Sequence, residues 1–333
     1  MYRYQDIKEV HFEITTKCQA RCPQCPRRVP GGGVLNPFIT LDDVSLKQFK
    51  QWFPEDFLKQ LTKLFMCGNL GDPVVARDTL AIFEYLREIN PKILLAMNTN
   101  GSARDKHFWQ RLGELDLDIM FGIDGLADTH HLYRVGTDWH KIMENVKTFI
   151  AAGGRAHWHM LVFKHNEHQV EECRQLSKDM GFEWFDAKHS TRWSSFELAV
   201  IDDAGRKMHT IEPSDYSVKM YHKQEKIKQV QTGISCKAVG YKQIYVSANG
   251  NINPCCWLDL DWVNPWQTSR IDYMEKINNF PNLNKTTLQD IFSQGHFDKI
   301  EQTWGVSPLE ECSKQCGAFD KHREQFIDGF IEG

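Results

Sequence analysis

The sequence predicts an α/β fold with a parallel sheet, followed by a small cysteine-rich domain that contains a β-hairpin and helices. Two observations support the sheet: short apolar segments alternate with amphipathic helical segments over the first two thirds of the chain, and turn or cap residues separate them. Such alternation favours parallel strands, because each parallel connection needs a crossover. A third observation supports the second domain, since the last third contains five of the ten cysteines and an Asn-Gly turn.

Six short apolar segments are expected to form strands. They are residues 9–15, 63–67, 92–97, 117–123, 156–163 and 182–187. Two of the helices between them show one apolar face at helical spacing, through Ile82, Tyr85, Leu86 and Ile89 in one and Trp139, Ile142, Met143, Val146 and Ile150 in the other. Gly153 and Gly181 are typical of helix C-termini. Functional residues of barrel folds lie at the carboxyl ends of the strands, so we expect a site in the loops that follow these segments.

Composition excludes several classes of protein. A net charge of −4 gives no general attraction to nucleic acid or to an anionic membrane. No apolar run reaches the ~18 residues of a membrane span, and the N-terminus lacks the apolar stretch of a signal peptide. Ten cysteines in a chain of 333 residues without such a signal favour metal ligation in a reducing cytoplasm over disulfides.

Cys18, Cys22 and Cys25 are the most informative residues of the chain. Their C-x3-C-x2-C spacing lets three thiolates hold three irons of a [4Fe-4S] cluster, which leaves the fourth iron open to a second molecule. A structural zinc or cluster site would normally recruit a fourth ligand nearby, and no other cysteine lies within forty residues of Cys25. The alternative interpretation is a zinc knuckle or a scatter of buried thiols.

This spacing, directly after a strand, resembles the radical S-adenosylmethionine (SAM) superfamily. Three further segments resemble motifs of that family. Gly68–Pro73 follows the second expected strand and is similar to the G-G-E-P element that lines the SAM amino group, with Asp72 in place of Glu. Asn98–Gly101 resembles the T-N-G element, and Gly122–Gly125 resembles the S-I-D-G element near the SAM ribose and carboxylate. Arg134 matches a family arginine that approaches the SAM carboxylate.

The resemblance implies a partial (β/α)6 TIM-like barrel and a definite chemistry. SAM would chelate the open iron, and reduction of the cluster by a donor such as flavodoxin or ferredoxin would cleave it to methionine and a 5'-deoxyadenosyl radical. That radical would remove a hydrogen atom from the substrate. The residues that the resemblance assigns to SAM are Gly71, Asp72, Pro73, Asn100, Asp124 and Arg134.

The last third of the chain resembles the SPASM and Twitch extensions of the same superfamily. Cys236, Gly250 and Cys255 match the C-x(9–15)-G-x4-C opening of these extensions, and Asn249-Gly250 indicates a hairpin. A helix that opens with a capping-box pattern at residues 287–292 precedes the last two cysteines. The resemblance implies one auxiliary [4Fe-4S] cluster, with the ligands Cys236, Cys255, Cys312 and Cys316. Cys256 in place of Cys255, and a zinc ribbon in place of the cluster, are the alternatives.

These interpretations divide the chain into three parts. Residues 1–195 are expected to form the radical SAM partial barrel, residues 196–233 a linker helix region, and residues 234–333 the auxiliary-cluster domain. No acid–base residue can be assigned; Asp259, Asp261 and Tyr241 are candidates from the auxiliary-cluster segment.

The expected function is oxidative modification of a peptide or protein by a radical SAM enzyme. No peptide-recognition domain precedes the first strand, so capture of a leader peptide would need a separate recognition protein. One alternative is a dehydrogenase or epimerase that acts on a small molecule such as a sugar, aminocyclitol or nucleotide. Modification of a nucleic acid ranks below both. An alternative of another class is a non-catalytic, metal-stabilised binding protein.

Overall fold

The computed structural model describes residues 1–193, 195–224, 233–260 and 281–317. The described strands form an eight-stranded sheet of order β10-β9-β1-β2-β3-β4-β5-β6 and a two-stranded sheet, β7-β8. Contacts between residues divide the chain into two compact units. The first comprises Met1–Thr16, Thr40–Leu95 and the described residues from 233 to 317, and the second comprises Lys17–Ile39 and the described residues from 96 to 224.

The first unit is centred on strand β1. It contains η1 (Tyr4–Asp6), β1 (Glu9–Phe12), α1 (Leu46–Trp52), α2 (Glu55–Gln60), β2 (Lys63–Met66), η2 (Pro73–Val75) and α3 (Thr79–Ile89), and strand β3 (Leu94–Thr99) begins in it. Its C-terminal elements are α9 (Lys237–Tyr241), β9 (Gln243–Val246), β10 (Ile252–Asn253), α10 (Trp257–Leu260), α12 (Leu288–Ser293), α13 (His296–Thr303) and α14 (Glu310–Cys316). Strand β1 pairs in parallel with both β2 and β9.

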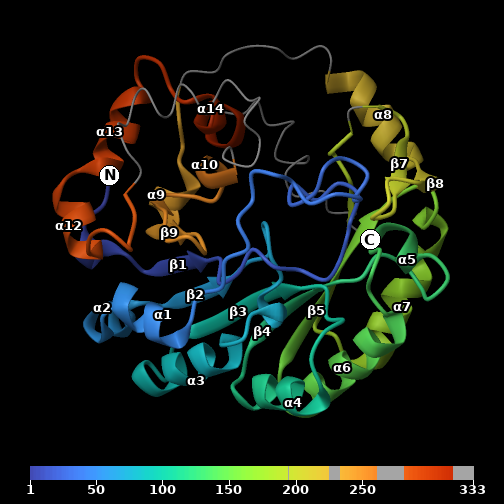
Figure 1. Cartoon of the computed structure of the whole chain (residues 1–333), viewed down its shortest axis with the longest axis horizontal. Coiled ribbons are helices and arrows are strands. Elements are labelled where there is room, and N and C mark those ends of the chain that lie inside the picture. The colour runs from blue at the N-terminus through green and yellow to red at the C-terminus, as the bar shows by residue number, and fades with distance from the viewer. Residues whose placement is uncertain (194, 225–232, 261–280, 318–333) are drawn as a thin grey trace. The chain divides into compact units, whose positions relative to one another are not determined.

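Aromatic side chains hold the helices of the first unit against its strands. Phe12 of β1 is fully buried and contacts Phe49 and Phe53, with ring centroids 5.4 Å and 5.8 Å away. Figure 1 shows α1, α2 and α3 together along one side of β1 and β2. Burial of large aromatic rings supplies much of the free energy that stabilises such a core.

The hairpin β9-β10 depends on a glycine in its turn. Gly250 has φ +87°, a conformation that costs a non-glycine residue free energy, and it lies in the turn that reverses the chain after β9. The helix α12 begins as its sequence predicts, because the Thr287 side chain accepts the backbone N–H of Asp290 and donates to its carboxylate at 2.7 Å. These two local signals position the hairpin and the helices of the C-terminal segment.

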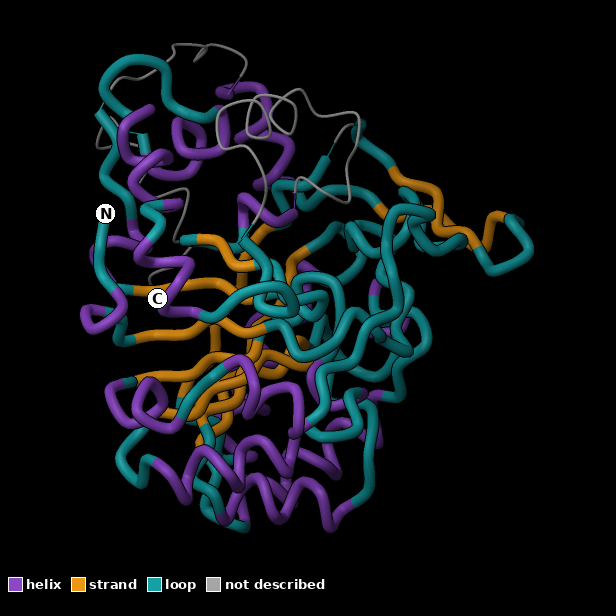
Figure 2. Tube along the Cα trace, turned by 60° about the vertical axis from the view of Figure 1, so that its left-hand side comes forward, coloured by secondary structure: helices purple, strands orange, loops and turns teal. Residues whose placement is uncertain are grey.

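The second unit contains the later strand–helix repeats. Its elements are the end of β3, α4 (Lys106–Glu114), β4 (Asp118–Gly122), α5 (His130–Tyr133), α6 (Trp139–Ala151), β5 (Arg155–Val162), η3 (Glu167–Gln169), α7 (Val170–Met180), β6 (Trp184–His189), β7 (Leu198–Ile201), β8 (Lys207–Ile211) and α8 (Asp215–Gln224). Strands β3 to β6 pair in parallel in chain order. Figure 2 shows a layer of helices, in purple, below the orange strands. Trp109 of α4 and Phe121 of β4 connect the two layers, with ring centroids 5.5 Å apart.

The structure confirms the α/β class and the six parallel strands, each of which begins and ends within three residues of its predicted position. The expected linker helix region, residues 196–233, contains the antiparallel strands β7 and β8 before α8. Strand β8 carries exposed Lys207 and Met208, so its sequence shows no buried apolar pattern that predicts a strand. No helix in the described part of the chain is long and apolar enough to cross a membrane.

Replacement of Gly250 by alanine should destabilise the first unit by about 2 kcal/mol, because strain at positive φ adds to a steric clash. A Cβ atom at this position would lie 2.8 Å from the Asn284 side chain and 3.0 Å from the Trp52 ring. The matched control is Gly205→Ala, since Gly205 also has a positive φ but no atom within 4 Å of an added Cβ. Thermal or urea unfolding should show a clearly larger loss for Gly250→Ala; equal losses would contradict the packing argument.

Candidate functional site

The three cysteines of the C-x3-C-x2-C motif lie in the second unit and pack against one apolar cluster. Cys22 is a buried member of this cluster together with Tyr133, Val135 and Phe163, and Cys18 and Cys25 pack against it. The backbone N–H of Cys25 donates to the Cys22 carbonyl at 3.0 Å, which closes a turn between them. The three predicted ligands therefore lie at one apolar cluster of the second unit.

Polar groups surround these thiols. The Cys18 sulfur accepts the Ala20 N–H at 3.4 Å and the Asn100 side-chain amide at 3.7 Å. Asn100 is itself oriented by Gln19, whose amide donates to Asn100 Oδ1 at 2.7 Å. Hydrogen bonds to cluster sulfurs are one of the means by which proteins set a cluster's reduction potential. Asn100, predicted as a SAM contact, thus lies next to a predicted cluster ligand.

Burial and nearby cations act in opposite directions on these thiols. Burial raises the pKa of Cys22 to about 11, while the Arg134 guanidinium lowers it. Burial also raises the pKa of Cys25, against the influence of Arg192, Arg27 and Arg134. Thiolates in such a place need either these cations or a bound metal to balance their charge. The donor set and its surroundings fit an iron–sulfur cluster.

Asp124 and Arg134, both predicted as SAM contacts, form a buried ion pair. Arg134 Nε lies 2.5 Å from Asp124 Oδ2, and Asp124 Oδ1 accepts the Leu161 N–H at 2.7 Å. Burial tends to lower the pKa of Arg134, but Asp124 and Cys22 raise it, so the guanidinium stays charged. A Cβ at Gly122 would lie 2.7 Å from the guanidinium, so glycine is what allows Arg134 to lie over the backbone there. Both Asp124 oxygens are engaged by the protein itself.

The Gly71–Pro73 segment lies in the first unit. Asp72 is buried and caps the short helix η2, since its Oδ1 accepts the Val74 N–H at 3.2 Å. The backbone N–H groups of Leu70 and Gly71 both donate to the carboxylate of Glu13, the latter at 3.1 Å. The conformation of this loop is therefore determined by two carboxylates, of which the sequence analysis identified only Asp72.

Glu13 belongs to a buried polar network that sequence reasoning missed. Its Oε2 accepts the Tyr245 hydroxyl at 2.5 Å, and that hydroxyl lies 3.5 Å from Asp259 Oδ2. Asn253 donates to the other Asp259 oxygen at 3.3 Å. Burial raises the pKa of Glu13 to about 7 and the pKa of Asp259 to about 8, the latter with a contribution from the Glu13 charge. The one sequence signal was a carboxylate between Phe12 and Ile14 in an otherwise apolar segment.

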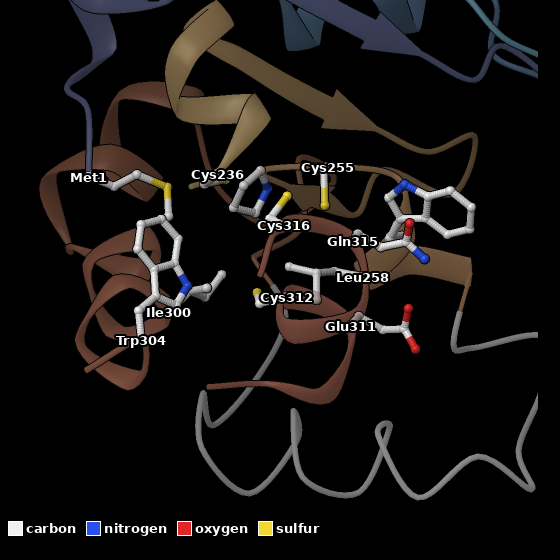
Figure 3. A pocket seen from close by; sticks show the side chains of 12 residues that line it. Met1, Cys236, Cys255, Leu258, Ile300, Trp304, Glu311, Cys312, Gln315 and Cys316 are labelled. Carbon is white, nitrogen blue, oxygen red and sulfur yellow. The ribbon is translucent and has the colours of Figure 1, made fainter. Parts of the chain in front are cut away.

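The predicted auxiliary ligands gather in the first unit. Figure 3 shows the pocket that they line, and Cys236, Cys255, Cys312 and Cys316 all contribute to it with Leu258, Ile300 and Trp304. The segment that precedes Cys236 is tied to α14, because the Ser235 N–H donates to the Cys316 carbonyl at 2.8 Å. The indole Nε1 of Trp304 is buried beside the Cys312 thiol, and its hydrogen bond acts against the rise that burial causes in the pKa of that thiol. Four thiols beside an indole N–H donor suit a group that bears sulfur atoms.

Cys256 does not line this pocket. Its thiol lies beside Asn69, Glu13 and Asp259 instead. Among the described residues, no three Cys, His, Asp or Glu side chains are arranged to hold a single metal ion. Of the acid–base candidates, Asp259 is buried, Tyr241 is exposed, and Asp261 lies outside the described residues.

Comparisons with known proteins find family matches over both cysteine-containing segments. The family profile described as the radical SAM superfamily matches residues 12–176, and the SPASM profile, described as an iron–sulfur cluster-binding domain, matches residues 236–317. A search of functionally curated proteins finds no significant match.

Solved structures show the same fold at low sequence identity. Streptococcus suis SuiB bound to S-adenosylmethionine is 14% identical with a TM-score of 0.54, over 91% of this chain and 66% of its own. SuiB bound to the precursor peptide SuiA has a TM-score of 0.52 at 14% identity, over 95% and 68%. Native anSMEcpe with bound AdoMet and the Cp18Cys peptide has a TM-score of 0.54 at 15% identity, over 98% and 91%. The chain thus spans just under two thirds of the length of SuiB in the SAM-bound structure.

The buried carboxyls of Glu13 and Asp259 should make stability fall as pH rises. Both pKa values are raised above their unfolded values, so their contribution is complete below about pH 4 and is lost as pH rises through about 7 and 8. Asp259→Asn removes one titrating group and should flatten the fall in unfolding free energy between pH 5 and 8 by about 1 kcal/mol per pH unit. Urea unfolding across this range measures the slope. Glu55→Gln, which removes an exposed carboxylate of α2, is the control and should follow the wild-type curve.

Proposed function

Because the chain belongs to the radical SAM superfamily and carries a C-terminal iron–sulfur cluster-binding domain of the SPASM family, we propose that it oxidatively modifies a peptide or protein. The observation that carries this proposal is the presence of both profiles in one chain, each over a segment in which the structure gathers cysteine thiols. A radical domain supplies hydrogen-atom removal, and a second cluster supplies a place for the electron that an oxidation leaves behind.

Each domain has a set of residues suited to its cofactor. In the second unit, Cys18, Cys22 and Cys25 would hold the SAM-binding [4Fe-4S] cluster, with Asn100 against the Cys18 sulfur and Arg134 against Cys22. In the first unit, Cys236, Cys255, Cys312 and Cys316 would hold an auxiliary [4Fe-4S] cluster in the pocket of Figure 3. When bound, the clusters and SAM supply one-electron chemistry that removes a hydrogen atom from the substrate.

The chain's own side chains exclude water from the SAM-side thiols and fix the position of the groups around them. The apolar cluster of Tyr133, Val135 and Phe163 keeps water from the thiols of the SAM-side cluster. Asp124 holds Arg134 in place, so the guanidinium presents its charge to the Cys22 thiol from a fixed position. Hydrogen bonds from backbone N–H groups to Glu13 and Asp72 fix the loop of Gly71, Asp72 and Pro73. Such a loop suits recognition of a small cationic group, such as an ammonium, by backbone and carboxylate oxygens.

Two findings support a peptide or protein as the substrate over a small molecule. The solved structures of SuiB with its precursor peptide and of anSMEcpe with a peptide share the fold of this chain over at least 95% of its length. The reductant is a one-electron donor of the flavodoxin or ferredoxin class. Seven of the ten cysteines belong to the two predicted ligand sets, which favours action in the reducing cytoplasm.

The test is an anaerobic assay of the reconstituted protein with dithionite, SAM and candidate peptide or protein substrates. We expect formation of 5'-deoxyadenosine together with a loss of two hydrogens from a peptide, both measured by mass spectrometry. The control is Cys22→Ala, which should abolish both products, since it removes a ligand of the SAM-side cluster. Release of 5'-deoxyadenosine that requires a sugar or other small alcohol, with peptides unchanged, would contradict the proposed substrate class. Absence of SAM cleavage by the iron-loaded protein would contradict the enzyme function.

The pocket geometry predicts different roles for two adjacent cysteines. Cys255→Ser should remove the auxiliary cluster and reduce iron from about eight to about four atoms per chain, because a [4Fe-4S] cluster needs its thiolate ligands. Cys256→Ser should retain all the iron, because the Cys256 thiol lies outside the pocket. Iron analysis and electron paramagnetic resonance of the reconstituted variants measure the outcome. The reverse pattern would assign ligation to Cys256.

A further inference from the structure

One carboxylate, that of Glu13, holds the backbone that leads into the Gly71–Pro73 loop. The Glu13 side chain is fully buried, and its Oε1 accepts the N–H groups of both Leu70 and Gly71. Its other oxygen accepts the Tyr245 hydroxyl. One oxygen of this carboxylate thus holds the loop after β2, and the other contacts strand β9.

A buried carboxylate at this position is not explained by stability alone. Its removal from water costs several kcal/mol, and its hydrogen-bond donors among the described residues, the N–H groups of Leu70 and Gly71 and the Tyr245 hydroxyl, are all neutral. An apolar residue would extend the run of Phe12 and Ile14 at lower cost. What the carboxylate provides is a conformation: two successive backbone N–H groups must point at one oxygen, which fixes the peptide plane between Leu70 and Gly71.

The second oxygen connects this loop to the C-terminal domain. Tyr245 is fully buried in β9, and its hydroxyl lies between Glu13 and Asp259. Asp259 is in α10, whose first residue follows Cys255 and Cys256 directly, and it also accepts from Asn253 of β10. The network therefore runs from the loop after β2, through Glu13 and Tyr245, to the segment that follows an auxiliary-cluster cysteine.

We propose that Glu13 is a positioning residue for SAM, which holds the Leu70–Gly71 backbone in the SAM-binding conformation, and that Tyr245 makes this conformation depend on the C-terminal iron–sulfur domain. The inference deepens the proposed function and rests on it, since it takes Gly71–Pro73 as a SAM-binding loop. It assigns to the auxiliary domain a role in SAM binding that does not involve its cluster.

Three variants separate this role from a general loss of structure. Glu13→Leu removes the acceptor but keeps the size of the side chain, and leaves two buried N–H donors unsatisfied. Glu13→Gln keeps an amide oxygen for Leu70 and Gly71 and places its NH2 group against the Tyr245 oxygen, so it should rescue the loop. Tyr245→Phe keeps Glu13 and removes only the hydroxyl. Thr287→Val is the matched control, because it removes an acceptor of a backbone N–H in the same unit, at the start of α12.

The first measurement is amide hydrogen exchange of residues 68–74 in the protein without SAM. Glu13→Leu should raise exchange of this segment by at least tenfold, because each unsatisfied donor costs more than 1 kcal/mol. Tyr245→Phe should raise it about threefold, and Glu13→Gln and Thr287→Val should leave it at the wild-type value. Unchanged exchange in Glu13→Leu would overturn the inference without reference to any activity.

The second measurement is the equilibrium dissociation constant for SAM, on anaerobically reconstituted chains with equal iron content. Glu13→Leu should weaken SAM binding by at least tenfold and Tyr245→Phe by about threefold, whereas Glu13→Gln should stay within threefold of the wild-type value. Faster exchange with unchanged SAM affinity would reduce Glu13 to a structural residue and overturn the proposal. An equal loss in Thr287→Val would also overturn it, since the effect would then follow from stability.

The two proposals fail in different ways. A wild-type chain that binds and cleaves SAM but leaves peptides unchanged contradicts the substrate class and leaves the role of Glu13 intact. A wild-type chain loaded with iron that does not bind SAM contradicts the proposed function and this inference together. Normal SAM affinity in Glu13→Leu, beside a peptide-modifying wild type, contradicts the inference alone.

Discussion

The parallel pairing of β1 with two strands that are far apart in the sequence is the constraint on which the first unit depends. His11 lies opposite Phe65 of β2 on one side and Tyr245 of β9 on the other. This register places the residue two positions further on, Glu13, within reach of both the loop after β2 and the Tyr245 hydroxyl. A shift of one residue would turn Glu13 to the opposite face and break both sets of hydrogen bonds.

The structure compensates two buried carboxylates in different ways, and the difference matches what each has to do. Asp124 lies against a guanidinium, so an ion pair balances its charge and fixes Arg134 beside Cys22. In the described part of the chain the donors to Glu13 are neutral, and its pKa rises because they do not offset the loss of water. The first arrangement contributes a cationic environment to the thiols. The second contributes a fixed backbone conformation, and the protonation of Glu13 and its neighbour Asp259 depends on pH.

The surroundings of each cysteine indicate its role. Cys22 is part of an apolar cluster together with its neighbours in the motif, and Cys255 opens onto a pocket with three other thiols. Cys173 is fully buried on α7, where it is a small apolar residue of the core. Cys67 and Cys256 have raised pKa values through burial and border the Glu13 network, outside both predicted ligand sets. The division of domains at residues 195 and 233 stays a prediction.

Local patterns in the sequence determined the α/β class, the six parallel strands, the hairpin at Gly250 and the cap of α12, because periodicity, glycine conformation and cap chemistry act over a few residues. The spacing of Cys18, Cys22 and Cys25 identified the family for the same reason. The sequence did not reveal that Asp124 and Arg134 pair with each other, that Cys256 lies outside the pocket that Cys255 lines, or that strands β7 and β8 are present. The sequence also did not indicate which residues contact Glu13, because Leu70 and Tyr245 are 57 and 232 residues away along the chain. Only the tertiary structure decided these features, because they depend on which distant groups share a buried volume where every donor and charge must find a partner.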